Sequence, residues 1–131
     1  MKRVLIVDDN AIIRKGVMAV FATDHSFEIC GEAADGQDAI EKAKNLKPDL
    51  VVLDFSMPVM NGMEAARVLT LVMPDVPLIL LTMHFGKIIE VDAQRAGFRA
   101  IFTKGQNLEI LVSRARALLG LPLGRAKSGG I

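Results

Sequence analysis

The chain has 131 residues and a net charge of +1, with 51% apolar and 24% charged residues. Such values are typical of one soluble globular domain that can bury a proper core. Acidic and basic residues are interspersed, so the charge gives no support for binding nucleic acid or an anionic membrane. The single cysteine excludes a disulfide framework, and no apolar run approaches the roughly 18 residues of a membrane span. The first apolar run stops at Val7, too short for a signal peptide, so we predict a cytoplasmic protein.

The first part of the chain carries three predicted strands and two predicted helices. Residues 4–7 are a short apolar run, and residues 50–54 are a second one, rich in β-branched side chains. Runs of this kind predict strands that are buried on both faces of a parallel sheet. Residues 27–33 alternate instead and predict a less buried edge strand. Amphipathic patterns between these strands predict helices over residues 11–21 and 37–45.

The second part continues the same alternation of strands and helices. Helices are predicted over 62–73, 88–96 and 107–119, and strands over 77–82 and 100–103. The helix over 88–96 has an irregular apolar face, and Gly97 is its expected C-cap. After Gly120 the composition shifts to small and polar residues. We therefore predict one domain over residues 1–120, followed by a linker or flexible tail over 121–131.

Five strands that alternate with five helices predict an α/β, doubly wound, flavodoxin-like (βα)5 fold with a five-stranded parallel sheet. Right-handed crossovers leave few topologies, and 2-1-3-4-5 is the common strand order. In that order the first and third strands are neighbours. Functional groups of open parallel sheets gather at the carboxyl ends of the strands, so the residues that end these strands are the candidates for a site.

Polar side chains end each of the buried strands. Asp8 and Asp9 follow the first strand, Asp54 ends the third, Thr82 ends the fourth, and Lys104 follows the fifth. Taken singly, each has a plain structural explanation as a cap or a strand end. Taken together, they predict a site where crowded carboxylates need a lysine and a hard divalent cation such as Mg²⁺. Asp9 and Asp54 are candidate ligands, together with a backbone carbonyl just after Asp54.

This set suits phosphoryl transfer. Mg²⁺ and an ammonium stabilise phosphoryl oxygens, a hydroxyl can donate to one, and an aspartate can accept the group covalently. The sequence contains no Walker-A loop, no G-x-G-x-x-G and no G-x-S-x-G. Nucleotide-binding and α/β-hydrolase functions therefore lack support.

The residues Asp8-Asp9, Asp54 within Leu-Asp-Phe-Ser-Met-Pro, Gly62, Thr82 and Lys104 resemble those of receiver (response regulator) domains of two-component signalling. The resemblance covers about residues 2–120 and extends to receivers of LuxR-type (NarL/FixJ-like) regulators. It implies that Asp54 is phosphorylated by a histidine kinase or histidine phosphotransfer protein, with Thr82 and Lys104 on the phosphoryl oxygens. It implies a Mg²⁺ site formed by Asp9, Asp54 and the Ser56 carbonyl, with Asp8 acting mainly through metal-bound water.

The chain departs from the pattern of this family at two positions. Receivers usually carry Tyr or Phe three residues before the lysine, where this chain has Ile101. Phe102 should face the opposite side of the strand and stay in the core. Many receivers follow the lysine with a proline in a cis peptide, whereas this chain has Gly105. The sequence therefore does not determine the peptide geometry at Lys104-Gly105. Ser56 and His84, two residues beyond Asp54 and Thr82, are expected to flank the path of the water that hydrolyses the phosphoryl group.

Several functional alternatives remain open at this point. The chain is a stand-alone receiver or the front part of a transcription factor with a LuxR-type DNA-binding domain; in neither case does this domain itself bind nucleic acid or a membrane. The oligomeric state is open between a monomer and a homodimer. A rival from another class is a pseudo-receiver, a protein-interaction module that no longer uses phosphate. An enzyme of aspartyl-phosphate chemistry lacks its Asp-x-Asp-x-Thr motif, so we expect a regulatory phosphoacceptor and no separate enzyme activity.

Overall fold

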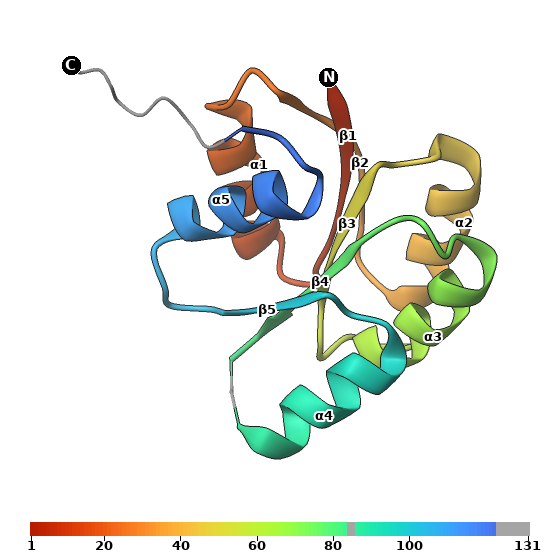
Figure 1. Ribbon diagram of the computed structural model, residues 1–131. Coiled ribbons are helices and arrows are strands. Elements are labelled where there is room, and N and C mark those ends of the chain that lie inside the picture. The colour runs from red at the N-terminus through yellow and green to blue at the C-terminus, as the bar shows by residue number, and fades with distance from the viewer. Residues whose placement is uncertain (84–85, 123–131) are drawn as a thin grey trace.

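The computed structural model describes residues 1–83 and 86–122. Five strands form one parallel sheet in the order β2-β1-β3-β4-β5, and a helix follows each strand (Figure 1). The predicted doubly wound flavodoxin-like fold and its strand order are therefore confirmed. The strands are β1 (Lys2–Val7), β2 (Phe27–Ala33), β3 (Leu50–Asp54), β4 (Leu78–Thr82) and β5 (Ala100–Thr103). The helices are α1 (Ala11–Ala22), α2 (Gly36–Leu46), α3 (Gly62–Val72), α4 (Lys87–Ala96) and α5 (Leu108–Leu118).

The ends of the elements follow from local capping. Side chains cap four of the helices: Asn10 for α1, Asp35 for α2, Asn61 for α3 and Asn107 for α5. These short polar side chains accept hydrogen bonds from the free N–H groups of the first turn. The helix predicted with an irregular apolar face, α4, starts after Gly86 without a side-chain cap and ends at Gly97, whose φ of 106° is in the left-handed region. The largest boundary error lies in β1, which starts at Lys2 instead of Val4 because Lys2 and Arg3 pair with β2.

The sheet is covered on both faces, which explains why its central strands are continuous apolar runs. Figure 1 shows α1 and α5 on one side of the sheet and α2, α3 and α4 on the other. Successive strand residues alternate between the two cores: Val51 and Leu53 pack on the α2–α3–α4 side, and Leu50 and Val52 pack on the α1–α5 side. All five residues of β3 and all five of β4 are buried.

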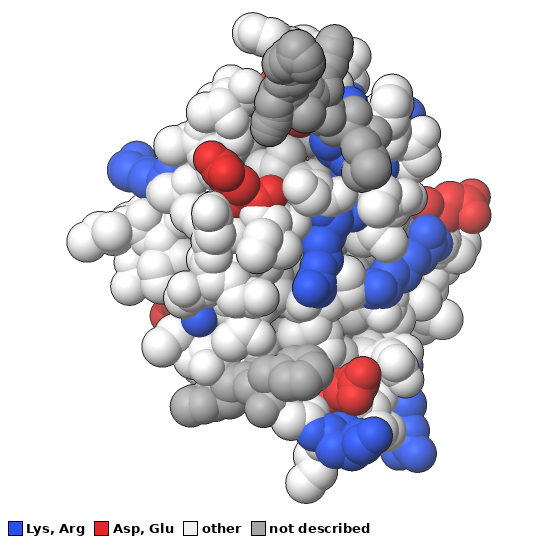
Figure 2. All heavy atoms as spheres, turned by 60° about the vertical axis from the view of Figure 1, so that its left-hand side comes forward, with Lys and Arg blue, Asp and Glu red and all other residues white. Residues whose placement is uncertain are grey.

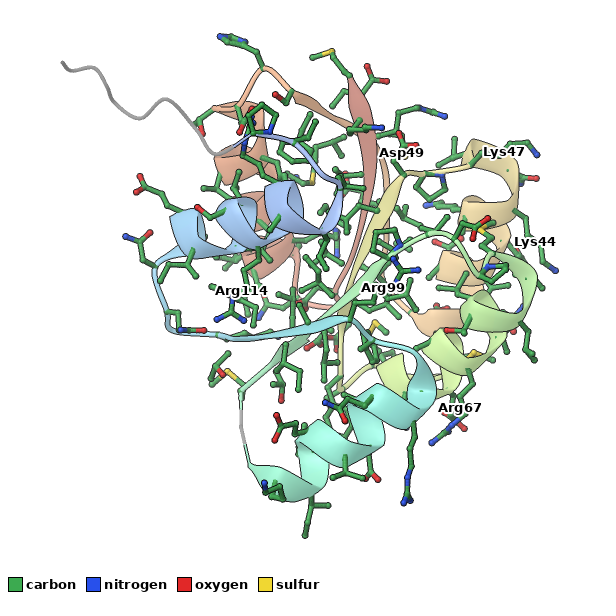
Figure 3. The ribbon with its side chains drawn as sticks, in the orientation of Figure 1. Lys44, Lys47, Asp49, Arg67, Arg99 and Arg114 are labelled. Carbon is green, nitrogen blue, oxygen red and sulfur yellow. The ribbon has the colours of Figure 1, made fainter. Side chains whose placement is uncertain are left out.

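The edge strands are less covered than the central ones. On β2, which is an edge strand as predicted, Cys30 is only half-buried, and burial raises the pKa of its thiol. On β5, Phe102 is fully buried in the α1–α5 core, while Ile101 packs against the other core, so the expectation that they face opposite sides is confirmed. The carbonyl of Ile101 accepts a hydrogen bond from Arg114 Nη1 at 2.8 Å, and Figure 3 shows Arg114 beside β5.

The chain beyond α5 is described only as far as Pro122. Leu121 packs on the α1–α5 core, and Arg116 Nε donates to the Pro122 carbonyl at 2.6 Å. The predicted linker or tail therefore lies largely outside the described residues, and its boundary at residue 120 stays a prediction. Within the described ranges, no helix is long and apolar enough to cross a bilayer.

Candidate functional site

Three aspartates meet where β1 and β3 end side by side. Asp8 follows the last residue of β1 and is fully buried, Asp9 is exposed in the next turn, and Asp54 ends β3 with 4% of its surface exposed. One carboxylate oxygen from each of the three lies within 4.8 Å of the others. The adjacency of β1 and β3 in the sheet places Val7 opposite Leu53, which brings the residues that follow them together.

Lys104 supplies a positive charge to this cluster. Its Nζ lies 2.8 Å from Asp54 Oδ1 and 3.0 Å from Asp8 Oδ2, and its side chain is 14% exposed. Burial acts against the charged form of the lysine, but its contacts with Asp54 and Asp8 outweigh burial and raise the pKa of the ammonium. Burial raises the pKa of the Asp54 carboxyl, and the charges of Asp8 and Asp9 raise it further. One ammonium therefore does not compensate three carboxylates.

The cluster fits a hard divalent cation. Its ligand atoms are all carboxylate oxygens, the type that Mg²⁺ prefers. Asp8 Oδ1 accepts the Asn10 N–H at 2.9 Å, whereas Asp8 Oδ2 is buried, lies 3.0 Å from Lys104 Nζ and accepts no hydrogen bond of regular geometry in the described part of the chain. A buried carboxylate oxygen without a hydrogen bond indicates a place where a cation or its bound water would be accepted.

Of the remaining predicted site residues, the structure describes Thr82 and Ser56 but not His84. Thr82 ends β4 and is 1% exposed, and its carbonyl accepts the Lys104 N–H at 2.7 Å. Ser56 is exposed in the loop after β3, and the predicted role of its carbonyl as a metal ligand stays a prediction. Gly105 follows a trans peptide bond and has a φ of 101°. His84 lies outside the described residues, so its predicted position beside the site stays a prediction.

The structure adds one residue that the sequence did not suggest. Arg14, near the start of α1, donates from Nη1 to the carbonyl of Asp8 at 2.7 Å and from Nε to Glu32 at 2.6 Å. Nothing in the local sequence indicated that its guanidinium turns back to the loop before the helix.

Replacing Lys104 should destabilise the protein when no cation is present. In Lys104→Met, the buried carboxylates of Asp8 and Asp54 lose their counter-charge. We therefore expect the free energy of unfolding, measured with urea in EDTA, to fall by about 2–3 kcal/mol. Mg²⁺ should restore most of this loss and bind more tightly than to the wild type, because it no longer competes with the ammonium. Lys44→Met is the control, since Lys44 is exposed on α2 and points away from the sheet (Figure 3). Equal stability of Lys104→Met and wild type in EDTA would contradict the prediction.

Comparison with known proteins gives a consistent result. Residues 4–116 match the response regulator receiver domain family. The chain is 37% identical to the transcriptional regulatory protein YhcZ of Bacillus subtilis over 110 residues, which cover 84% of this chain and 51% of that protein. It spans about half the length of the transcriptional regulators among its curated relatives.

Two solved structures show the same fold. The receiver domain of the response regulator NarL from Mycobacterium tuberculosis superposes with a TM-score of 0.83 at 28% identity, over 91% of this chain and 97% of that one. The CheX–CheY–BeF₃–Mg²⁺ complex from Borrelia burgdorferi matches with a TM-score of 0.83 at 27% identity, over 89% of this chain and 88% of that one. The matches thus include both a NarL-type receiver, as the sequence predicted, and a chemotaxis protein.

Proposed function

We propose that this chain, which belongs to the response regulator receiver family, is a phosphoacceptor switch in which Asp54 takes a phosphoryl group from a phosphohistidine. The donor is a histidine kinase or a histidine phosphotransfer protein. The observation that carries the proposal is the meeting of Asp8, Asp9 and Asp54 at one strand edge, with Lys104 in contact with two of them. Three crowded carboxylates repel one another and so destabilise the fold, which a purely structural role would not explain.

The transfer itself follows from the chemistry of a carboxylate. An oxygen of Asp54 forms a new bond to phosphorus as the bond between phosphorus and the donor histidine nitrogen breaks. The electron pair of that bond stays on the imidazole nitrogen, which takes a proton from water. Lys104 and the Thr82 hydroxyl bind the phosphoryl oxygens as their charge develops. The low exposure of Asp54 limits access of water to the acyl phosphate.

A Mg²⁺ ion would be held by Asp9, Asp54 and the Ser56 carbonyl, with Asp8 acting through bound water. Together with the Lys104 ammonium, it would be the second positively charged group that neutralises the phosphoryl oxygens. The solved CheX–CheY complex named above includes Mg²⁺ and BeF₃, and its fold matches this chain, which supports a divalent cation in this chain as well. This is a regulatory phosphoacceptor, with no enzyme activity beyond its own phosphorylation and dephosphorylation.

The output of the switch is proposed from the relatives. Several are transcriptional regulators of which this chain matches about half the length, and one matched structure is a LuxR-family response regulator, which supports a cytoplasmic role beside a LuxR-type DNA-binding domain. The receiver itself would not bind DNA: on the face in Figure 2, charges of both signs are interspersed among uncharged residues. Because Phe102 is fully buried and Ile101 replaces the usual aromatic, phosphorylation should act on the loop after Thr82 without rotating an aromatic ring.

The proposal is tested by intact-mass measurement of the wild-type chain. Incubation with acetyl phosphate and Mg²⁺ should add the mass of one phosphoryl group, and EDTA should prevent the addition. No added mass with acetyl phosphate, or with a phosphorylated histidine phosphotransfer domain as donor, would favour the alternative pseudo-receiver, a protein-interaction module that keeps the acids but does not use phosphate.

A further inference from the structure

Arg14 connects three elements around the acidic edge. Its Nη1 donates to the Asp8 carbonyl at 2.7 Å and its Nε to Glu32 Oε1 at 2.6 Å, so one side chain of α1 joins the β1–α1 loop to the end of β2. We propose that Arg14 is a positioning residue that holds the Asp8-Asp9 loop in the geometry required for divalent cation binding. This inference rests on the proposed function, since it concerns the same cation site.

The backbone of Asp8 is fixed from both sides. Its N–H donates to the Ala33 carbonyl at the end of β2 (3.1 Å), and its carbonyl accepts from Arg14. The Asp8 side chain is in turn fixed through Oδ1, which accepts the Asn10 N–H. Because Asp9 lies between Asp8 and Asn10, this set of bonds also restricts the position of the Asp9 backbone, from which its exposed carboxylate extends. Without Arg14, the Asp8 carbonyl loses its side-chain hydrogen bond.

The contact of Arg14 with Glu32, at the end of β2, is also held in place. The side chain of Arg14 is only 16% exposed, and its hydrogen bond is the main reason that the pKa of the Glu32 carboxyl is lowered. The Glu32 backbone carbonyl accepts a hydrogen bond from Lys42 Nζ at 2.6 Å, and Lys42 lies on α2. The guanidinium is thus held on a strand end that is itself tied to a second helix. An anchored guanidinium can restrict the Asp8 loop, whereas a freely rotating one could not.

The sign of the effect separates positioning from charge. A guanidinium near a cation site repels the cation, so if Arg14 acted only through its charge, its removal would strengthen Mg²⁺ binding. If Arg14 positions the ligands, its removal weakens Mg²⁺ binding. Lys104→Met provides the comparison, because it also removes one positive charge but from a side chain that competes directly for the carboxylates.

Mg²⁺ binding to the full chain is measured by isothermal titration calorimetry, well below the unfolding temperature of each variant. We expect Arg14→Met to bind Mg²⁺ about tenfold more weakly than wild type, the scale typical of groups that orient metal ligands. Arg14→Lys keeps the charge but cannot reach both acceptors from two nitrogens, so it should also bind more weakly. Arg3→Met is the matched control: it removes the same charge from the opposite end of β1, where Arg3 pairs with Glu28 at 3.5 Å, and should leave Mg²⁺ affinity unchanged.

A second readout needs no metal. In EDTA, hydrogen exchange of the Asp8 and Asn10 amides should be faster in Arg14→Met than in wild type, while exchange in β3 stays the same. Equal or tighter Mg²⁺ binding by Arg14→Met, or unchanged exchange of these two amides, would overturn the positioning role. A wild-type chain that takes up no Mg²⁺ would instead overturn the cation site of the proposed function together with this inference.

Discussion

Asp54→Ala is expected to accept no phosphoryl group from acetyl phosphate under conditions that label the wild-type chain completely. Asp54 and Asp8 both contact Lys104 Nζ, but Asp54 keeps 4% of its surface exposed, whereas Asp8 is fully buried, so a donor reaches Asp54 more easily and the ammonium stabilises the phosphoryl group formed there. Asp9 is exposed, and Asp8 is fully buried with Oδ1 engaged by Asn10. Neither can replace Asp54 as the acceptor.

The same variant should keep its fold. In Asp54→Ala, Lys104 retains its contact with Asp8, so no buried charge is left without a partner, and we expect unfolding free energy to change by no more than about 1 kcal/mol. Intact-mass measurement and urea unfolding give the two readouts. Asp75→Ala, an exposed aspartate between α3 and β4, is the control and should be labelled like the wild type. A phosphoryl mass that persists in Asp54→Ala would show that another residue is the acceptor.

The fold could be predicted because both faces of the sheet are covered. Covered strands must be apolar at every position, so residues 50–54 stood out as a continuous run, and the exposed edge strand β2 alternated instead. The predicted starts of α1, α3 and α5 lie within one residue of the observed ones, where Asn10, Asn61 and Asn107 accept hydrogen bonds in the first turn. The handedness of the crossovers then left few topologies, and the common strand order among them is the observed one.

The site could be predicted in its residues but not in its contacts. The carboxyl ends of the strands indicated which side chains would meet, and the structure brings Asp8, Asp9, Asp54 and Lys104 together. The roles of Ser56 and Thr82 stay predictions. The reach of Arg14 to the Asp8 carbonyl was not predictable, since the direction of a long side chain depends on neighbours from other elements. Val59 has a φ of 67°, unfavourable for a β-branched residue, and nothing in Pro58-Val59-Met60 indicates it.

Gly62→Ala is expected to lower the free energy of unfolding by about 2–3 kcal/mol, as overpacking against a rigid neighbour does. Gly62 is the first residue of α3, and its N–H donates to the Phe55 carbonyl at 2.9 Å. A Cβ atom at this position would lie 2.3 Å from the Asp54 carbonyl oxygen and 3.1 Å from Phe55 Cα. Both are backbone atoms of the segment that carries the proposed phosphoacceptor, so they cannot move aside without displacing Asp54. Mg²⁺ binding should weaken together with stability.

Helix propensity predicts the opposite sign and makes the measurement decisive. Alanine is favoured over glycine inside a helix by up to about 1 kcal/mol, so a helix without this contact would be stabilised by the same substitution. Gly16→Ala is the matched control: Gly16 lies within α1, and the nearest atom to its added Cβ would be a Leu108 side-chain carbon at 3.9 Å, an ordinary contact. Urea unfolding should therefore show Gly16→Ala slightly more stable than wild type and Gly62→Ala clearly less stable. If Gly62→Ala were as stable as wild type, the start of α3 could move away from β3, and the close approach of the helix would not be what fixes Asp54 at the strand end.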